Sequence, residues 1–228
     1  MNASNVQPIV ILPGYTRVMR RGPLITFEGG EGTGKSTQIE RLRTYLEGKG
    51  WTVLVTREPG GTPLAESIRQ LLLEPRYDPD PLTELFLLEA SRREHVDRVI
   101  RPALERGEAV VCDRFSDSSM VYQGIAGGVP EATVAFLNAV ATSGLVPDRT
   151  IVLDLEAEEG LKRARRRNED LGHSSRIDES PATFHRRVRE GYLELARREP
   201  KRVRMIDAQG TPEEVFERIL EALPEALR

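Results

Sequence analysis

The sequence predicts an α/β protein, with a five-stranded parallel sheet flanked by helices on both faces. Short apolar segments alternate with longer segments of helical periodicity along the chain, which is the pattern of a parallel sheet built from strand–helix units. The 228 residues include 39% hydrophobic and 30% charged residues, enough for one substantial core. Because no repeat and no Gly/Ser-rich linker interrupts residues 19–228, we expect a single domain there.

The elements follow in a regular order. Ile39, Leu42, Tyr45 and Leu46 have helical spacing, and Gly50 ends that helix. The apolar runs predict strands over 24–28, 52–56, 109–113, 150–155 and 203–207. The periodic segments predict helices over 36–49, 64–73, 81–106, 156–168, 181–198 and 212–223. Residues 168–180 lack periodicity and are expected to form a mobile loop.

Composition excludes several classes of protein. A net charge of -3 gives no overall basic field for nucleic acid, and the apolar runs are too short to span a membrane. Cys112 is the one cysteine and lies in an apolar run, so we expect a buried thiol and no disulfide framework. The three histidines, His95, His173 and His185, share no metal-ligand spacing, so we expect them to be structural or solvated. Residues 1–18 resemble neither a secretory signal nor a transit peptide; we expect a disordered tail and a cytoplasmic protein.

A glycine-rich motif carries the strongest chemical signal. Gly29-Gly30-Glu31-Gly32-Thr33-Gly34-Lys35-Ser36 fits G-x-x-x-x-G-K-[ST] and lies between a predicted strand and helix. Its backbone N–H groups would face a phosphate. Lys35 could then reach the β/γ-phosphates, and the Ser36 hydroxyl could bind Mg²⁺. The motif predicts a P-loop NTPase fold that binds ATP.

Two further segments follow strands at the same expected sheet edge. Asp113 ends the third strand, where a carboxylate can hold the Mg²⁺ shell, and Arg114 beside it suits a phosphate. Arg57 follows the second strand, and a guanidinium binds phosphate bidentately. Taken alone, Asp113 and Arg114 could equally be a surface salt bridge, and Arg57 could belong to an ordinary turn.

Together these segments resemble the thymidylate kinase family, over residues 23 to about 220. The motifs that carry the resemblance begin with Phe27-Glu28-Gly29-Gly30-Glu31-Gly32-Thr33-Gly34-Lys35-Ser36-Thr37 and Thr56-Arg57-Glu58-Pro59-Gly60-Gly61-Thr62. Ser91-Arg92-Arg93-Glu94-His95-Val96, Asp113-Arg114-Phe115-Ser116-Asp117-Ser118-Ser119 and Tyr122-Gln123-Gly124 complete them. The resemblance implies phosphoryl transfer from Mg·ATP to dTMP, giving dTDP, by a homodimer.

The resemblance also implies roles for individual residues. Glu31 would accept a hydrogen bond from the 3′-OH of dTMP, and Arg57 and Arg114 would hold its phosphate. Arg92 would reach a thymine carbonyl. The remaining implied contacts are Ser119 and Gln123 at the base, Tyr122 against C2′ of the sugar, and Gly29 to Thr37 around ATP. The alternatives are that Arg92 and Arg93 form a solvated helix face and that Tyr122 is plain core.

The sequence departs from the family pattern at three positions. Leu88 stands where a phenylalanine often stacks on thymine, and leucine lacks aromatic stacking geometry. Phe115 stands where tyrosine is common. Gly32 stands where one branch of the family carries a catalytic arginine. The other branch supplies this charge from a lid, here about residues 163–180, which contains Arg163, Arg165, Arg166, Arg167 and Arg176. We expect Arg167, followed by Arg165, to act; the alternative is a solvated basic helix face.

Other functions remain open from the sequence. A kinase for another nucleoside monophosphate or for a deoxynucleoside would keep the P-loop and change the acceptor. A nucleotide-dependent switch or a non-catalytic P-loop protein is a different class. The sequence has no Asn-Lys-x-Asp guanine motif, and intact Lys35, Ser36 and Asp113 favour catalysis.

Overall fold

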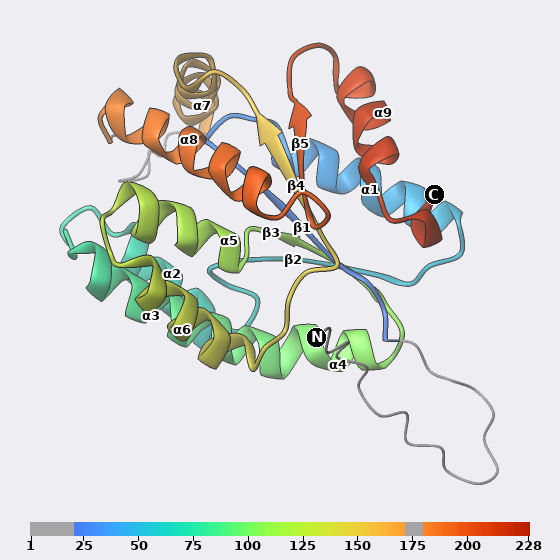
Figure 1. Cartoon of the computed structure of the whole chain (residues 1–228), viewed down its shortest axis with the longest axis horizontal. Coiled ribbons are helices and arrows are strands. Elements are labelled where there is room, and N and C mark those ends of the chain that lie inside the picture. Colours follow the sequence, from blue (N-terminus) through green and yellow to red (C-terminus); the bar gives the residue numbers. More distant parts are fainter. Residues whose placement is uncertain (1–20, 172–179) are drawn as a thin grey trace, which may run out of the picture.

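Five parallel strands form the centre of the computed structural model, which describes residues 21–171 and 180–228 (side chains from 167 to 171 excepted) (Figure 1). They are β1 (Leu24–Gly29), β2 (Val53–Arg57), β3 (Ala109–Asp113), β4 (Arg149–Asp154) and β5 (Val203–Asp207). Their order across the sheet is β2-β3-β1-β4-β5, and every neighbouring pair is parallel. This arrangement confirms the predicted sheet.

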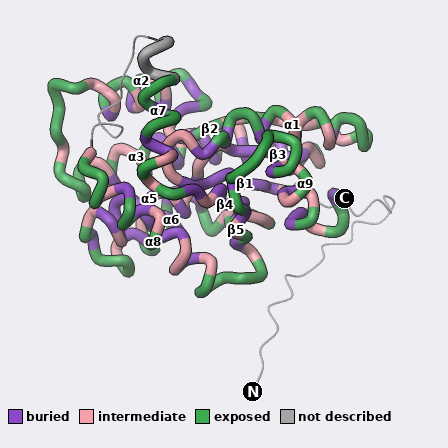
Figure 2. Tube along the Cα trace, turned by 90° about the horizontal axis from the view of Figure 1, so that it is seen from above, coloured by how far each residue is buried: buried purple, intermediate pink, exposed green. Residues whose placement is uncertain are grey.

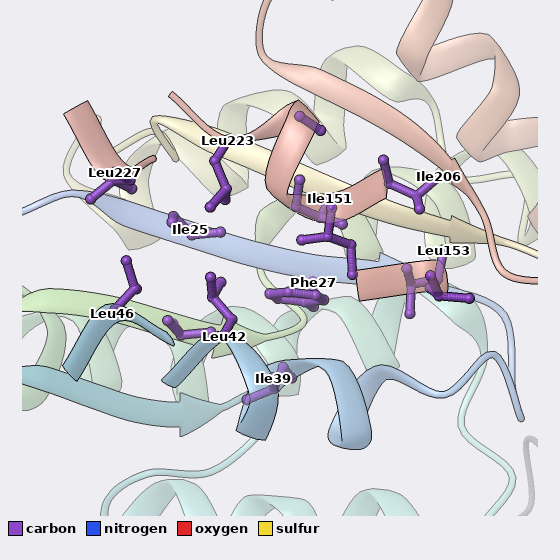
Figure 3. Close-up of a cluster of buried hydrophobic side chains, with 14 of the residues drawn as sticks. Ile25, Phe27, Ile39, Leu42, Leu46, Ile151, Leu153, Ile206, Leu223 and Leu227 are labelled. Atoms are coloured by element: carbon purple, nitrogen blue, oxygen red, sulfur yellow. The ribbon is translucent and has the colours of Figure 1, made fainter. Parts of the chain in front are cut away.

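One face of the sheet packs against α1 (Lys35–Gly48) and α9 (Pro212–Ala222). Alternate strand residues point to this face, as the two-residue period of a strand requires, and Ile25 and Phe27 of β1 meet Leu42 of α1 there (Figure 3). Figure 2 shows the inner strands β1, β3 and β4 as the buried centre of the molecule, with exposed helix surfaces around them, whereas the edge strands β2 and β5 are partly exposed. This cluster fixes the direction in which α1 leaves the P-loop.

The opposite face takes the other set of strand residues. Leu24 and Cys112 pack there against η1 (Val96–Ile100) and α4 (Arg101–Glu105), while Val152 packs against η2 (Met120–Ala126) and α8 (Ala182–Arg198). Helices therefore cover both faces, and Cys112 is a buried free thiol as predicted. The remaining helices are α2 (Pro63–Leu73), α3 (Pro81–His95), α5 (Ser116–Ser119), α6 (Glu131–Thr142), α7 (Ala157–Leu171) and η3 (Glu225–Leu227).

The observed helices agree with the predicted ones except in three places. The segment 81–106, predicted as one α-helix, contains the π-helical η1 in its middle. Pro102, which lacks an N–H and crowds the preceding turn, lies two residues after the end of η1. Helix α7 continues to Leu171, into the segment predicted as loop. The helices between 116 and 142 were not predicted. Ser and Gly residues obscure the helical period of α5 and η2, and α6 is apolar around most of its circumference, which weakens its period.

Two predicted segments are not part of the described structure, and one prediction concerns membrane-spanning helices. The expected tail 1–18 and residues 172–179 of the expected lid lie outside the described residues. Among the described helices, none is long and apolar enough to cross a membrane.

Candidate active site

Three strand ends meet at the carboxyl edge of the sheet. Phe27 of β1 pairs in register with Asp113 of β3, and Asp113 pairs with Arg57 of β2. The P-loop begins two residues after Phe27, and Arg114 follows Asp113 directly. The sheet therefore brings together the three segments that the sequence placed on one edge.

The P-loop runs from β1 into α1 through backbone conformations that favour glycine. Gly29, Gly32 and Gly34 have φ angles of 128°, 68° and 89°. A Cβ atom on Gly32 would lie 2.0 Å from the carbonyl oxygen of Gly160 in α7. The first turns of α7 thus touch the loop directly, which explains why position 32 holds no arginine in this chain.

Lys35 lies beneath the loop at the start of α1. Its Nζ donates to the carbonyl oxygens of Gly29 at 3.2 Å and Gly30 at 2.8 Å. Burial, followed by the charge of Arg114, lowers the pKa of the Lys35 ammonium. The ammonium is therefore poorly solvated, and a phosphate in the loop would give it a charged partner.

Ser36 and Asp113 provide oxygen atoms of the kind that Mg²⁺ prefers. Ser36 is exposed in the first turn of α1. The Oδ1 atom of Asp113 is buried and has no hydrogen-bond partner in the described part of the chain. Within that part, no group of three or more acidic, His or Cys residues could hold a metal, but Mg²⁺ in kinases commonly takes one or two protein oxygens plus phosphate oxygens and water. The residues present fit such a site.

Arg114 points from the end of β3 toward the P-loop. Its Nη2 donates to Glu31 Oε1 at 2.6 Å, and its guanidinium lies 5.0 Å from the centre of the Tyr122 ring. The residue has a φ of 68°, uncommon for a side chain other than glycine. Its backbone N–H donates to the carbonyl oxygen of Phe27 at 2.9 Å. The structure thus brings Arg114, Glu31 and Tyr122 together.

Arg57 lies at the end of β2 beside two residues of α2. Its Nη2 donates to both carboxylate oxygens of Glu66, at 3.1 and 2.9 Å, and Glu66 also accepts the backbone N–H of Gly61 at 3.0 Å. Arg69, one turn later, donates to the carbonyl oxygen of Pro59 at 3.1 Å. Burial, followed by the charge of Arg57, lowers the pKa of Arg69.

Glu66 and Arg69 were not among the residues predicted from the sequence. Both lie on α2, outside the motif that follows β2, and only the packing of α2 back toward the sheet edge brings them to Arg57. Their Glu-x-x-Arg spacing places them on one face of the predicted helix, but spacing alone does not say which way that face points.

Arg92 is almost completely buried, at 2% exposure of its side chain. Its Nε donates to Glu58 at 2.7 Å, its Nη1 reaches Glu89 at 2.5 Å and Asn138 at 2.7 Å, and its Nη2 donates to the carbonyl oxygen of Phe115 at 3.2 Å. The solvated-face alternative is therefore wrong for Arg92. It holds for Arg93, which is about half exposed and pairs with Asp97.

The residues expected at the base and sugar lie around Arg92 and Arg114. Ser119 is buried and accepts a hydrogen bond from Arg92 Nη1 at 3.1 Å. Gln123 donates through Nε2 to Glu84 at 3.2 Å, while its buried Oε1 has no partner among the described residues. Tyr122 is buried with its hydroxyl 3.5 Å from Glu31. Leu88 is half-buried on α3.

The predicted lid residues lie partly in α7. Arg163 is exposed and pairs with Glu159 at 3.0 Å. This arrangement agrees with the alternative prediction, in which Arg163 belongs to a solvated helix face. Arg165 and Arg166 are exposed. The side chain of Arg167 and all of Arg176 lie outside the described residues.

The histidines in the described part of the chain are buried. His95 contacts Thr56 at 2.7 Å and Glu58 at 3.1 Å, which holds the turn after β2 against α3. His185 packs edge-on against Phe184. Both fit the predicted structural role, and His173 lies outside the description.

A P-loop after the central strand, with arginines and the Asp113 carboxylate at the same sheet edge, defines a P-loop phosphotransferase. A family model described as thymidylate kinase matches residues 27–219. The thymidylate kinase of Symbiobacterium thermophilum is 50% identical over 204 residues, 89% of this chain and 93% of the relative. That of Caulobacter vibrioides is 51% identical over 193 residues, 84% of this chain and 91% of the relative.

A solved structure extends this similarity to the fold. The crystal structure of thymidylate kinase from Ehrlichia chaffeensis has a TM-score of 0.71 and 32% identity, and the match covers 88% of this chain and 97% of that one. This chain belongs to the thymidylate kinase family.

Proposed function

We propose that this protein transfers the γ-phosphoryl group of ATP to dTMP, giving dTDP and ADP. The observation that carries the proposal is the shared sheet edge, where a donor-phosphate loop faces Arg57 and Arg114. In the reaction, an oxygen of the dTMP phosphate forms a bond to the γ-phosphorus. The bond from that phosphorus to the β–γ bridging oxygen breaks, and ADP leaves. The protein's task is alignment and charge neutralisation.

The acceptor phosphate would lie between the arginines at the ends of β2 and β3. Arg57 and Arg114 are each held by a carboxylate, Glu66 and Glu31 respectively, so their guanidinium groups are already oriented. Arg69 adds a third, desolvated cation near them. Three guanidinium groups match the charge of a phosphate dianion better than one.

The donor phosphates would lie in the loop over Lys35, with Ser36 and Asp113 on Mg²⁺. When bound, Mg²⁺ would offset charge on the β- and γ-phosphate oxygens. Lys35 would exchange its two backbone acceptors for phosphate oxygens. The buried Oδ1 of Asp113 supports this assignment, since a buried carboxylate oxygen without a partner is costly.

The base and sugar would lie beside α3 and η2. Gln123 Oε1 needs a donor, which the N3–H of thymine supplies. Arg92 and Ser119 border the same position. Glu31 and Tyr122 lie where the 3′-OH and C2′ would come close. Leu88 would cover the ring by dispersion alone.

Charge on the transferring phosphoryl group would also require a cation from the lid. The contact between Gly32 and Gly160 leaves no room for one in the P-loop. We propose that Arg167, or failing it Arg165, supplies this charge from α7.

We also expect the reaction to take place in the cytoplasm, where ATP is available.

We further propose that the protein is a homodimer. Apolar side chains are exposed at helical spacings of seven residues on α2 (Leu64, Leu71) and four on α3 (Leu82, Phe86) and α6 (Phe136, Val140). These helices pack side by side (Figure 1). Apolar side chains gathered on one face commonly mark an interface. A second copy of this chain is the proposed occupant.

One assay tests the proposed reaction. ADP release from Mg·ATP should be fast with dTMP and slow with dUMP, dCMP, dGMP or thymidine, each measured at several concentrations. Fast turnover of another acceptor, with little of dTMP, would move the protein to the alternative kinase class. ATP binding without turnover of any acceptor would favour the non-catalytic alternative.

A further inference from the structure

A buried carboxylate without an assigned role lies under the site. Glu28 is the last residue of β1 before the P-loop glycines, and it is completely buried. One oxygen accepts the backbone N–H of Phe115 at 2.8 Å. The other accepts the hydroxyl groups of Ser118 at 2.5 Å and Tyr192 at 2.7 Å. All three donors are uncharged.

Such an arrangement is costly. A buried carboxylate is usually stabilised by a cation; here burial, followed by the charge of Asp117, raises the pKa of Glu28 to about 7. The neighbouring Asp117 has the usual solution, because Arg202 donates to both of its oxygens at 2.6 and 2.9 Å. The charge of Arg114 and the hydrogen bonds lower the pKa of Glu28 without offsetting its burial, and a carboxylate kept at such a cost points to a functional requirement rather than a gain in stability.

The contacts of Glu28 converge on the turn that carries Arg114. Two successive residues of β1 hold this turn: Phe27 accepts the N–H of Arg114 at 2.9 Å, and Glu28 accepts that of Phe115. These same residues lead directly into the P-loop. The turn includes the left-handed backbone of Arg114, so it needs such external support.

A second set of contacts closes a ring around Arg114. Ser118, held by Glu28, lies 3.4 Å from Arg114 Nη1. Tyr192 of α8 packs edge-on against Tyr122, with the ring centres 6.4 Å apart, and Tyr122 lies under the Arg114 guanidinium. Glu28 therefore fixes both the backbone of Arg114 and the residues that flank its side chain.

We infer that Glu28 is a positioning residue, which sets the acceptor-phosphate arginine in register with the P-loop. The inference rests on the proposed function. A displacement of about 1 Å between reacting groups can lower a rate by roughly 10²-fold. Loss of the acceptor oxygens at position 28 would free the Phe115 N–H and let the turn move relative to the loop.

The test compares two substitutions of similar size. Glu28→Leu removes every acceptor, and we expect kcat to fall by about 10²-fold, with the KM for ATP nearly unchanged. Glu28→Gln keeps one oxygen for the Phe115 N–H and should recover kcat to within about tenfold of the wild type. The control is Asp117→Asn, which removes one of the two carboxylates paired with Arg202 and leaves Glu199 as the other; it should lower Tm while kcat of the folded enzyme stays near the wild-type value.

The outcomes separate this inference from the proposed function. A wild-type enzyme without dTMP kinase activity would refute the function itself. With an active wild type, a folded Glu28→Leu variant of near-normal kcat would overturn the inference. Equal losses in Glu28→Leu and Glu28→Gln would also overturn it, because charge and not an acceptor oxygen would then matter. Should Glu28→Leu fail to fold, the double variant Ser118→Ala/Tyr192→Phe replaces it, because it removes two of the donors to Glu28. An unchanged kcat in this double variant would overturn the inference.

Discussion

At the scale of single residues, two buried ionisable groups lie within a few ångströms of the same loop and have opposite problems. Burial lowers the pKa of Lys35, whose ammonium donates to two backbone carbonyl oxygens. Burial raises the pKa of Glu28, which accepts hydrogen bonds from uncharged donors, and the nearby charge of Arg114 does not offset this rise. A phosphate of the substrate would compensate the buried charge of Lys35, whereas no substrate group is expected to compensate that of Glu28. They therefore give different predictions, one for turnover and one for stability.

Lys35→Ala should abolish most turnover without unfolding the protein. The ammonium is the cation nearest to the expected donor phosphates, and its loss should lower kcat by about 10³-fold or more. Steady-state ADP release measures the effect, and Tm confirms the fold. Lys49→Ala is the matched control, since Lys49 lies over Tyr45 at the other end of α1. Near-normal kcat in folded Lys35→Ala would refute the assignment.

Glu28→Gln should be more stable than the wild type above pH 7. The folded pKa of Glu28 is raised from 4.5 to about 7, so the wild type is penalised once pH exceeds the unfolded pKa. The penalty grows between pH 4.5 and about 7 and is constant above, at about 3 kcal/mol by linkage. Urea unfolding of both proteins at pH 4.5, 6 and 8 measures it. A stability difference that does not change with pH would show that Glu28 titrates normally.

Tyr122 should decide between deoxyribose and ribose. Its buried ring lies under Arg114 with its hydroxyl near Glu31, where the sugar is expected. Tyr122→Ala should narrow the ratio of kcat/KM for dTMP over ribo-TMP by about tenfold, because a hydroxyl at C2′ would then find room. Tyr122→Phe, which keeps the ring, should retain most of the ratio. If Tyr122→Ala leaves the ratio unchanged, another residue excludes the ribose.

At the scale of elements, the local motifs could be predicted and the contacts between distant segments could not. The P-loop and the position of Asp113 follow from short-range pattern, because a strand end and a helix start fix them. The burial of Arg92 depends on Glu58 and Asn138, which come from the turn after β2 and from α6. Because α6 was not predicted, its Asn138 could not be predicted as a hydrogen-bond partner of Arg92.

The lid is the element in which one arginine should stand out. Single alanine substitutions of Arg163, Arg165, Arg166, Arg167 and Arg176 should give one or two steep falls in kcat at saturating ATP and dTMP. An arginine on transferring charge is worth about 10³-fold or more, whereas loss of the exposed Arg163–Glu159 pair should matter little. Uniformly small effects on kcat would contradict a lid-borne catalytic arginine, and the arginine charge that is missing at position 32 would have no replacement.

At the scale of the whole molecule, the apolar face of α2, α3 and α6 predicts the state of association. Phe136 is 66% exposed and Phe86 55%. The exposed apolar residues lie four apart on α3 and α6 and seven apart on α2, and both spacings keep residues on one face of a helix. A monomer would leave these rings in water, whereas a second copy of the chain would bury them at about 25 cal/mol per Å². Sedimentation equilibrium should therefore give twice the 25.6 kDa of one chain.

Phe136→Glu should weaken this association, because it places a charge on the proposed contact face, where the charge would be desolvated without a partner. The expected result is a shift toward monomer at micromolar concentration, with the far-UV spectrum unchanged. Lys49→Glu, on the far side of the sheet at the end of α1, also introduces a carboxylate and should remain dimeric (Figure 1). If the wild type is monomeric, or if both variants dissociate alike, this face is not the interface, because a specific contact responds only to changes within it.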